Sequence, residues 1–214
     1  IIFKDLGLLI IDEEQKFGVN IKEKLKAFKS NVDTLTLTAT PIPRTMAMGV
    51  LSGLDISTIK SLPPNRTPIV TTTLPNNRRD ALINRIKSAI SKNSQVYWVC
   101  PLIDESESEL IGIEDLEKVL KKEFDSQDYE IIHGKMKDVD KQRILSDFKD
   151  KKTKILLATT VIEVGIDFPN ANLIIIENAN KFGLAQLHQL RGRVGRGEKQ
   201  GTCILLFKDG LSKN

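Results

Sequence analysis

Two stretches of the sequence place oxygen-bearing side chains directly after a short apolar segment. Asp12-Glu13-Glu14 follows the apolar residues 8–11, and Thr38-Ala39-Thr40-Pro41 follows the segment 35–37. Parallel α/β sheets bind ligands at the carboxyl ends of their strands. One carboxylate there can hold Mg²⁺ through its water shell, and the next can orient the water that attacks a phosphate. A solvated acidic turn, and a helix N-cap followed by proline, remain alternatives.

A third stretch, residues 158–167, reads Ala-Thr-Thr-Val-Ile-Glu-Val-Gly-Ile-Asp. At the end of a buried strand, Thr159 and Thr160 can offer hydroxyls and backbone N–H groups to a phosphate. Gly165 permits a turn, and Asp167 adds an acceptor. Taken by itself, the stretch also fits an ordinary junction between a strand and a helix.

A fourth stretch, residues 189–197, reads Gln-Leu-Arg-Gly-Arg-Val-Gly-Arg-Gly, with three arginines separated by glycine or valine. Glycine lets the backbone approach a ligand closely, and the guanidinium group matches pairs of phosphate oxygens. The stretch therefore predicts a phosphate-binding loop. A basic loop that only touches nucleic acid is the alternative.

Elements that could position these residues alternate along the chain. Continuous apolar runs are typical of strands buried on both faces of a parallel sheet; they occupy residues 8–11, 155–158, 173–176 and 204–207. Residues 35–37 and 97–100 are expected to be further strands. Amphipathic helical faces lie within residues 82–90, 113–120 and 144–148. The alternation predicts an α/β fold.

The clearest domain boundary is the double proline in residues 62–66, because such a pair cannot lie inside a helix or central strand. About two strands are expected before it and five or six after it. We therefore predict a truncated first domain, residues 1–62, and a complete second domain, residues 63–214. The sequence starts at Ile1 without an initiator Met, which suggests a piece of a longer protein.

Composition excludes several classes of protein. Charged residues make up 28% of the chain, aromatic residues 5%, and the net charge is +4. The low aromatic content disfavours a binder built on base stacking. The sequence has no apolar run of membrane-spanning length, so no membrane partner is expected. Cys100 and Cys203 are far apart, without metal-ligand spacing, and read as buried thiols of a reducing compartment.

The order of the four stretches resembles motifs II, III, V and VI of the superfamily 2 helicases. Longer segments, residues 10–19, 38–45 and 182–191, resemble both the RecG and the Mfd families of that superfamily. Residues 62–68, 95–107 and 161–165 resemble RecG in particular. A DEAD-box RNA helicase fits less well, because motif II here reads Asp-Glu-Glu-Gln.

The RecG resemblance implies two RecA-like domains that use ATP and Mg²⁺ to move on duplex DNA and remodel stalled forks and Holliday junctions in recombination and repair. It implies that Asp12 coordinates Mg²⁺ and that Glu13 positions the hydrolytic water. Thr38 and Thr40 would couple hydrolysis to DNA movement. Arg193 and Arg196, with Gln189 beside them, would be arginine fingers on the γ-phosphate.

The resemblance also assigns the remaining residues of the predicted site. Gly165 and Asp167 would line the nucleotide side of the second domain. Thr159 and Thr160 would face the DNA backbone, together with the turn His133-Gly134, although a lone histidine is often only structural. We expect a cytoplasmic, nucleoid-associated monomer. Its expected partners are branched or duplex DNA and replication or repair proteins.

Three departures limit these expectations. The phosphate-binding loop of such motors ends in Gly-Lys followed by Ser or Thr, whereas the one Gly-Lys pair here, Gly134-Lys135, precedes Met136. The wedge domain and the C-terminal helical hairpin of the family have no counterpart in these residues. We therefore expect that the chain alone does not hydrolyse ATP. An Mfd-like duplex translocase, and a non-catalytic module that binds DNA or a partner, remain alternatives.

Overall fold

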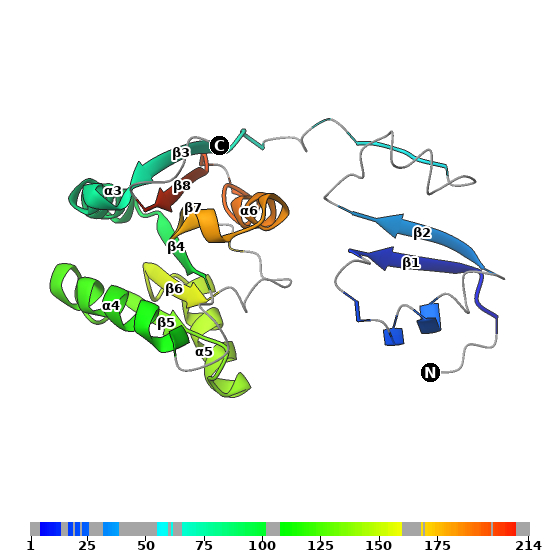
Figure 1. Cartoon of the computed structure of the whole chain (residues 1–214), viewed down its shortest axis with the longest axis horizontal. Coiled ribbons are helices and arrows are strands. Elements are labelled where there is room, and N and C mark those ends of the chain that lie inside the picture. Colours follow the sequence, from blue (N-terminus) through cyan, green and yellow to red (C-terminus); the bar gives the residue numbers. More distant parts are fainter. Residues whose placement is uncertain are drawn as a thin grey trace. The chain divides into compact units, whose positions relative to one another are not determined.

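The structure is a computed structural model that describes most of the chain. The described residues are 5–13, 17–18, 20–21, 23–25, 32–38, 55–59, 61, 66–101, 108–159, 168, 170–197 and 199–208. The chain divides into two compact units, residues 1–59 and 60–214 (Figure 1). Pro63-Pro64 lies outside the described residues, so the boundary at that turn stays a prediction.

The first unit contains two parallel strands, β1 (Leu8–Asp12) and β2 (Asp33–Leu37), which pair from Leu8 opposite Asp33 to Asp12 opposite Leu37. Ile11 is 2% exposed, but Leu8 and Ile10 are 53% and 57% exposed. The prediction that this apolar run is buried on both faces is therefore wrong for the described residues. Side chains alternate between the two faces of a strand, and the described residues of this unit leave the face of Leu8 and Ile10 uncovered.

The second unit is built on a six-stranded sheet in which every pair of neighbouring strands is parallel. Its strands, in spatial order, are β3 (Val70–Pro75), β8 (Thr202–Phe207), β7 (Ala171–Ile176), β4 (Gln95–Cys100), β6 (Ile155–Thr159) and β5 (Tyr129–Ile132). All residues of β4, β6 and β7 are buried, which explains their continuous apolar sequences. The predicted parallel α/β fold is confirmed.

Helices cover both faces of this sheet (Figure 1). One hydrophobic cluster joins α3 (Arg79–Ser91) and α4 (Ser108–Glu123) to one face, around the fully buried Trp98. A second cluster joins α5 (Asp138–Lys149) and α6 (Leu184–Arg191) to the other face, around Phe148. Short 3-10 helices lie at Asn76–Arg78 and Ala179–Lys181. Each fully buried large side chain contributes roughly 1.5–3 kcal/mol, so the two clusters hold the sheet rigid.

The loops at the amino ends of the strands are tied together by a buried amide. The Gln95 side chain, which is 5% exposed, donates hydrogen bonds to the carbonyls of Phe148 and Thr153, the latter at 2.8 Å. These bonds fix the turn between α5 and β6 against the start of β4. The amino edge of the sheet is therefore an ordered surface.

Two helices end at this edge with the same backbone motif. After α3, the N–H of Asn93 bonds to the carbonyl of Ile90 and that of Ser94 to Ala89; after α5, Lys151 bonds to Phe148 and Lys152 to Asp147. The first residue of each pair is left-handed, with φ 54° for Asn93 and 61° for Lys151. Glycine and asparagine favour this position, whereas lysine does not.

Lys151→Gly should therefore stabilise the fold by about 1 kcal/mol, because glycine has no Cβ to strain the left-handed backbone. Urea unfolding followed by circular dichroism measures the change. Asn93→Gly is the matched control and should have a smaller effect, since asparagine already tolerates this conformation. An unchanged or lower stability of Lys151→Gly would contradict the strain.

Candidate functional site

The carboxyl ends of β1 and β2 bring together three of the residues expected to do chemistry. Asp12 is the last residue of β1 and is exposed, and Thr38 directly follows β2. The N–H of Glu13 donates to the carbonyl of Leu37 at 2.9 Å, which fixes Glu13 beside the end of β2. The structure therefore places Asp12, Glu13 and Thr38 at one sheet edge.

Glu13 also has a left-handed backbone, with φ 52°. A residue other than glycine in this region costs roughly 1–3 kcal/mol, and such residues cluster at functional sites. The strain is consistent with a carboxylate that is held in a fixed direction. The left-handed backbone distinguishes Glu13 from a residue of an ordinary solvated acidic turn.

The carboxyl ends of β5 and β6 carry a second group of polar atoms. Ile132 of β5 pairs with Ala158 of β6, and the next residues along the two strands are His133 and Thr159. Thr159 is 1% exposed. The Nδ1 atom of His133 and the Oγ1 atom of Thr159 are buried without a hydrogen-bond partner among the described residues. Buried polar atoms are nearly always paired, and these two are among seven such atoms in the described part of the chain.

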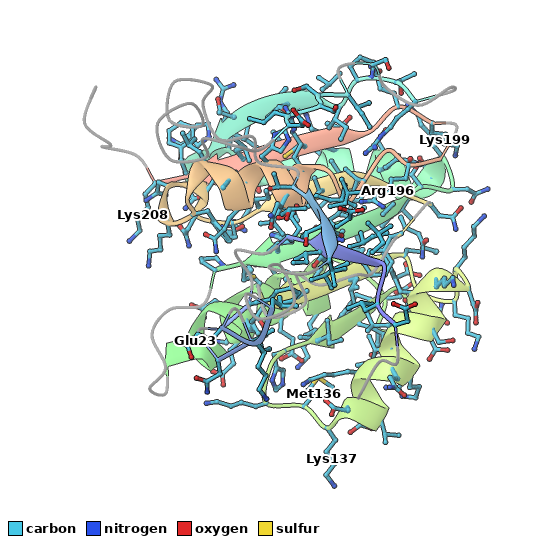
Figure 2. All side chains as sticks on the ribbon, turned by 90° about the vertical axis from the view of Figure 1, so that its right-hand side faces the viewer. Glu23, Met136, Lys137, Arg196, Lys199 and Lys208 are labelled. Carbon is cyan, nitrogen blue, oxygen red and sulfur yellow. The ribbon has the colours of Figure 1, made fainter. Side chains whose placement is uncertain are left out.

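The turn after β5 is closed by a hydrogen bond from the N–H of Met136 to the carbonyl of His133, at 3.2 Å. Gly134 lies inside this turn and is half-buried. The Lys137 side chain, at the start of α5, points away from the unit into solvent (Figure 2). The structure thus brings His133, Gly134 and Thr159 together at neighbouring strand ends.

The arginine-rich loop begins where α6 ends. Gln189 is a half-buried residue of that helix, and the N–H of Arg193 donates to the carbonyl of Leu190 at 3.0 Å. The Arg196 side chain is exposed, and its Nε donates to the carbonyl of Gly192 at 3.0 Å (Figure 2). Val194 between them is fully buried. The loop is therefore anchored by packing and hydrogen bonds, unlike a loosely solvated basic segment.

A glycine pair gives this loop its shape. Gly195 has φ +67°, and its N–H bonds to the carbonyl of Ala171. A Cβ on Gly195 would lie 2.9 Å from the Cα of Gly201, and a Cβ on Gly201 would lie 2.9 Å from the Cα of Gly195. Both neighbours are backbone atoms of this tight crossing, so neither position accepts a larger residue without displacing the loop.

Gly195→Ala should lower the free energy of unfolding by about 2 kcal/mol, because it adds left-handed strain and a backbone clash. Thermal and urea unfolding measure the loss. Gly192→Ala is the matched control, since its Cβ would meet no atom closer than 3.4 Å. Equal effects of the two substitutions would contradict the close approach of Gly195 and Gly201.

One cluster at the carboxyl edge, centred on a buried carboxylate, was not predicted from the sequence. Glu177, directly after β7, is 6% exposed, forms an ion pair with Arg79 and accepts a hydrogen bond from Nε1 of Trp98 at 3.1 Å. The Arg79 guanidinium lies 6.0 Å from the Trp98 ring centre. These residues tie the start of α3 to β4 and β7. Glu177 could have been found by the pattern that identified Asp12, which is a carboxylate directly after an apolar run.

This cluster borders a cavity of about 270 Å³, which Cys100 and Asp115 also line. Burial, with the Glu177 charge as a further contribution, raises the pKa of the Cys100 thiol, which stays protonated at neutral pH. Burial likewise raises the pKa of Cys203 to about 12. Both cysteines are free and buried, as the sequence predicts, and neither is a reactive nucleophile.

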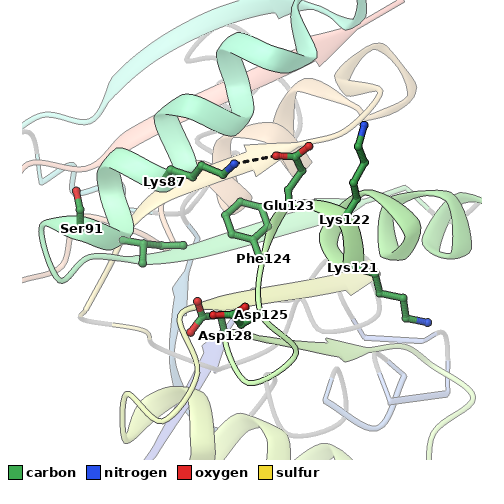
Figure 3. Close-up of a pocket in the computed structure, with 9 residues that line it drawn as sticks. Lys87, Ser91, Lys121, Lys122, Glu123, Phe124, Asp125 and Asp128 are labelled. Atoms are coloured by element: carbon green, nitrogen blue, oxygen red, sulfur yellow. Dashed lines mark hydrogen bonds and ion pairs between the residues drawn. The ribbon is translucent and has the colours of Figure 1, made fainter.

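A larger groove of about 420 Å³ lies between the C-terminal ends of α3 and α4 (Figure 3). The Lys87 ammonium lies 2.8 Å from the Glu123 carboxylate and 5.7 Å from the ring centre of Phe124. Its lining mixes lysines with Asp125 and Asp128. None of the residues predicted to do chemistry lines this groove.

Four predicted site residues lie outside the described residues: Thr40, Thr160, Gly165 and Asp167. Among the described residues, no group of three or more His, Cys, Asp and Glu is arranged to hold a metal ion. The described helices include none that is long and apolar enough to cross a membrane.

The sequence model of the family "Helicase conserved C-terminal domain" matches residues 73–198. The ATP-dependent DNA helicase RecG of Acidithiobacillus ferridurans is 47% identical over 98% of this chain, and that of Pasteurella multocida is 48% identical over 99%. This chain spans 31% of the length of each of these relatives.

A solved structure, RecG bound to a three-way DNA junction, matches 98% of this chain and 27% of that one, at 39% identity and a TM-score of 0.72. The match includes both units and confirms the RecA-like character of the parallel sheet. The chain therefore belongs to the family of the helicase conserved C-terminal domain, and it is a RecG-like helicase C-terminal region.

Proposed function

We propose that this chain is the motor portion of an ATP-dependent DNA helicase that remodels branched DNA, such as stalled forks and Holliday junctions, in recombination and repair. The observation that carries the proposal is its match, over 98% of the chain, to a RecG bound to a DNA junction. The gathering of Asp12, Glu13 and Thr38 at one sheet edge supports it, because a motor needs its hydrolytic and coupling groups side by side.

For hydrolysis, we assign separate roles to the described residues. The exposed Asp12 carboxylate suits Mg²⁺, which keeps most of its water shell and needs only one or two carboxylates. Mg²⁺ supplies charge neutralisation at the phosphates. Glu13 orients the attacking water, and Arg193 and Arg196, beside Gln189, stabilise the charge that develops on the γ-phosphoryl oxygens. Gly165 and Asp167 complete the nucleotide side.

For DNA, we assign the backbone contacts to Thr159 and Thr160 and to the turn at His133 and Gly134. The position of His133 and Thr159 at neighbouring strand ends supports this, because donors at such ends can face a phosphate oxygen. Contacts of this kind are independent of sequence and weaken with salt. Thr38 and Thr40 couple hydrolysis to movement along the DNA.

The setting of the whole protein forms part of the same proposal. We place it in the cytoplasm, associated with the nucleoid, as a monomer that meets replication or repair proteins. This chain alone is proposed to be inactive as an ATPase, because its one Gly-Lys pair is followed by Met136 rather than Ser or Thr. As isolated, it would then act only as a module that binds DNA or a partner.

The test is the ATPase activity of the complete parent protein on forked DNA and on linear duplex of equal length. Much stronger stimulation by the fork would support a branch-specific remodelling motor. Equal stimulation would instead favour a general duplex translocase of the Mfd kind. ATP turnover by this chain alone would refute its proposed inactivity.

A further inference from the structure

Lysines gather at the amino edge of the six-stranded sheet, opposite the carboxyl edge that carries His133 and Thr159. They lie at the end of α5 and in the three loops that precede β4, β6 and β8. We call them the amino-edge lysines: Lys92, Lys149, Lys151, Lys152, Lys154 and Lys199. All six are exposed. They are therefore available to an external partner.

The loops that carry these lysines lie side by side. The strands β8, β7, β4 and β6 are consecutive in the sheet, so the start of β8 lies roughly 14 Å from the start of β6 at about 4.8 Å per strand. The Lys199 ammonium donates to the carbonyl of Lys92 at 2.7 Å, which joins two of the loops. Gln95 joins the loop before β4 to the turn before β6. The lysines thus form one surface.

Part of the positive charge on this surface is not balanced within the described residues. Lys152 pairs with Asp147 at 2.7 Å and Lys154 with Asp128 at 2.8 Å. No described carboxylate lies within ion-pair distance of Lys149, the last residue of α5, or of Lys151 on the turn that follows; Asp150 between them accepts a bond from the Ser146 hydroxyl. Lys149 and Lys151 are therefore the members of this set near α5 that have no ion-pair partner in the described part of the chain.

The backbone conformation of Lys151 indicates that a lysine at this position has a role other than stabilising the fold. Its left-handed position favours glycine or asparagine, and the equivalent position after α3 is Asn93. A cation at a helix C-terminus also interacts favourably with the helix dipole, but Lys149 in the last turn of α5 already supplies one. Local rules are broken mainly where function requires it.

We propose that the amino-edge lysines bind the phosphate backbone of duplex DNA, at a surface separate from the turn of His133, Gly134 and Thr159 at the carboxyl edge. This inference rests on the proposed function, which supplies duplex DNA as the substrate. Lysine side chains act as mobile point charges toward phosphate and read no base sequence. A second contact at the amino edge of the second unit would keep the duplex bound while the contacts at His133, Gly134 and Thr159 are released and formed again.

The test measures binding of this chain to fluorescently labelled duplex DNA by anisotropy over a range of NaCl concentrations. The variant combines Lys149→Gln with Lys151→Gly, which removes the two unbalanced charges and relieves the strained backbone. Because each lost phosphate contact reduces the slope of log K against log salt by about 0.9, the slope should become shallower by about 2. Thermal unfolding should show a variant at least as stable as the parent chain.

The control variant combines Lys118→Gln with Lys121→Gln on the exposed face of α4, with the same loss of charge. It should leave the salt slope unchanged. An unchanged slope for the amino-edge variant, or an equal reduction in the control, would overturn the proposal while leaving the proposed function intact. Absence of duplex binding by the unsubstituted chain would also overturn the proposal. The proposed motor function would still stand, because it is tested separately by the fork-stimulated ATPase activity of the complete protein.

Discussion

Glu13→Gln in the complete parent protein should lower the turnover of ATP by about 10²–10⁴-fold, while ATP affinity stays within a few-fold of the original. The backbone of Glu13 is fixed at the end of β1 by the bond of its N–H to the carbonyl of Leu37, in a left-handed conformation. Glutamine keeps the size and the hydrogen-bonding reach of this side chain. It cannot accept the proton of the attacking water, so hydrolysis is lost without loss of binding.

Steady-state hydrolysis and equilibrium binding of a fluorescent ATP analogue separate the two effects. Glu23→Gln is the matched control, because Glu23 is an exposed glutamate of the same unit and has no proposed role (Figure 2). It should leave turnover unchanged. If Glu13→Gln retained normal turnover, the alternative of a solvated acidic turn would be correct and the catalytic assignment of Glu13 wrong.

Arg193→Ala should lower turnover by roughly 10³–10⁵-fold, which is the effect of removing an arginine that stabilises phosphoryl transfer. DNA affinity should change little. The loop that carries Arg193 is anchored by the buried Val194 and by the close approach of Gly195 to Gly201. Its arginines are therefore presented from a fixed backbone, as stabilisation of a transition state requires.

Single-turnover hydrolysis and DNA binding should be measured on the same preparation of the parent protein. Arg85→Ala is the control: Arg85 lies on the exposed face of α3, outside the arginine-rich loop, and its loss removes the same charge. It should change neither hydrolysis nor DNA binding. Loss of DNA binding with normal hydrolysis in Arg193→Ala would instead identify the stretch as a basic loop that only contacts nucleic acid.

The strands of the second unit were largely predictable because burial on both faces leaves a direct mark on the sequence. The runs at residues 97–100, 155–158, 173–176 and 204–207 all lie in strands of the sheet. The strands β3 and β5 were missed. Both are edge strands and partly exposed; β3 contains three consecutive threonines and β5 a glutamate, so neither has a continuous apolar run.

The sequence by itself determined which residues could do chemistry, because carboxylates, threonines and glycine-spaced arginines follow short apolar strands in a specific order. Only the tertiary structure decided which of them meet. Strand pairing puts Glu13 beside the end of β2 and His133 beside Thr159, and these neighbours are far apart in the sequence. The same holds for the Glu177–Arg79 ion pair and for Gly195 against Gly201. Such contacts depend on the order of strands in the sheet, which local sequence patterns do not encode.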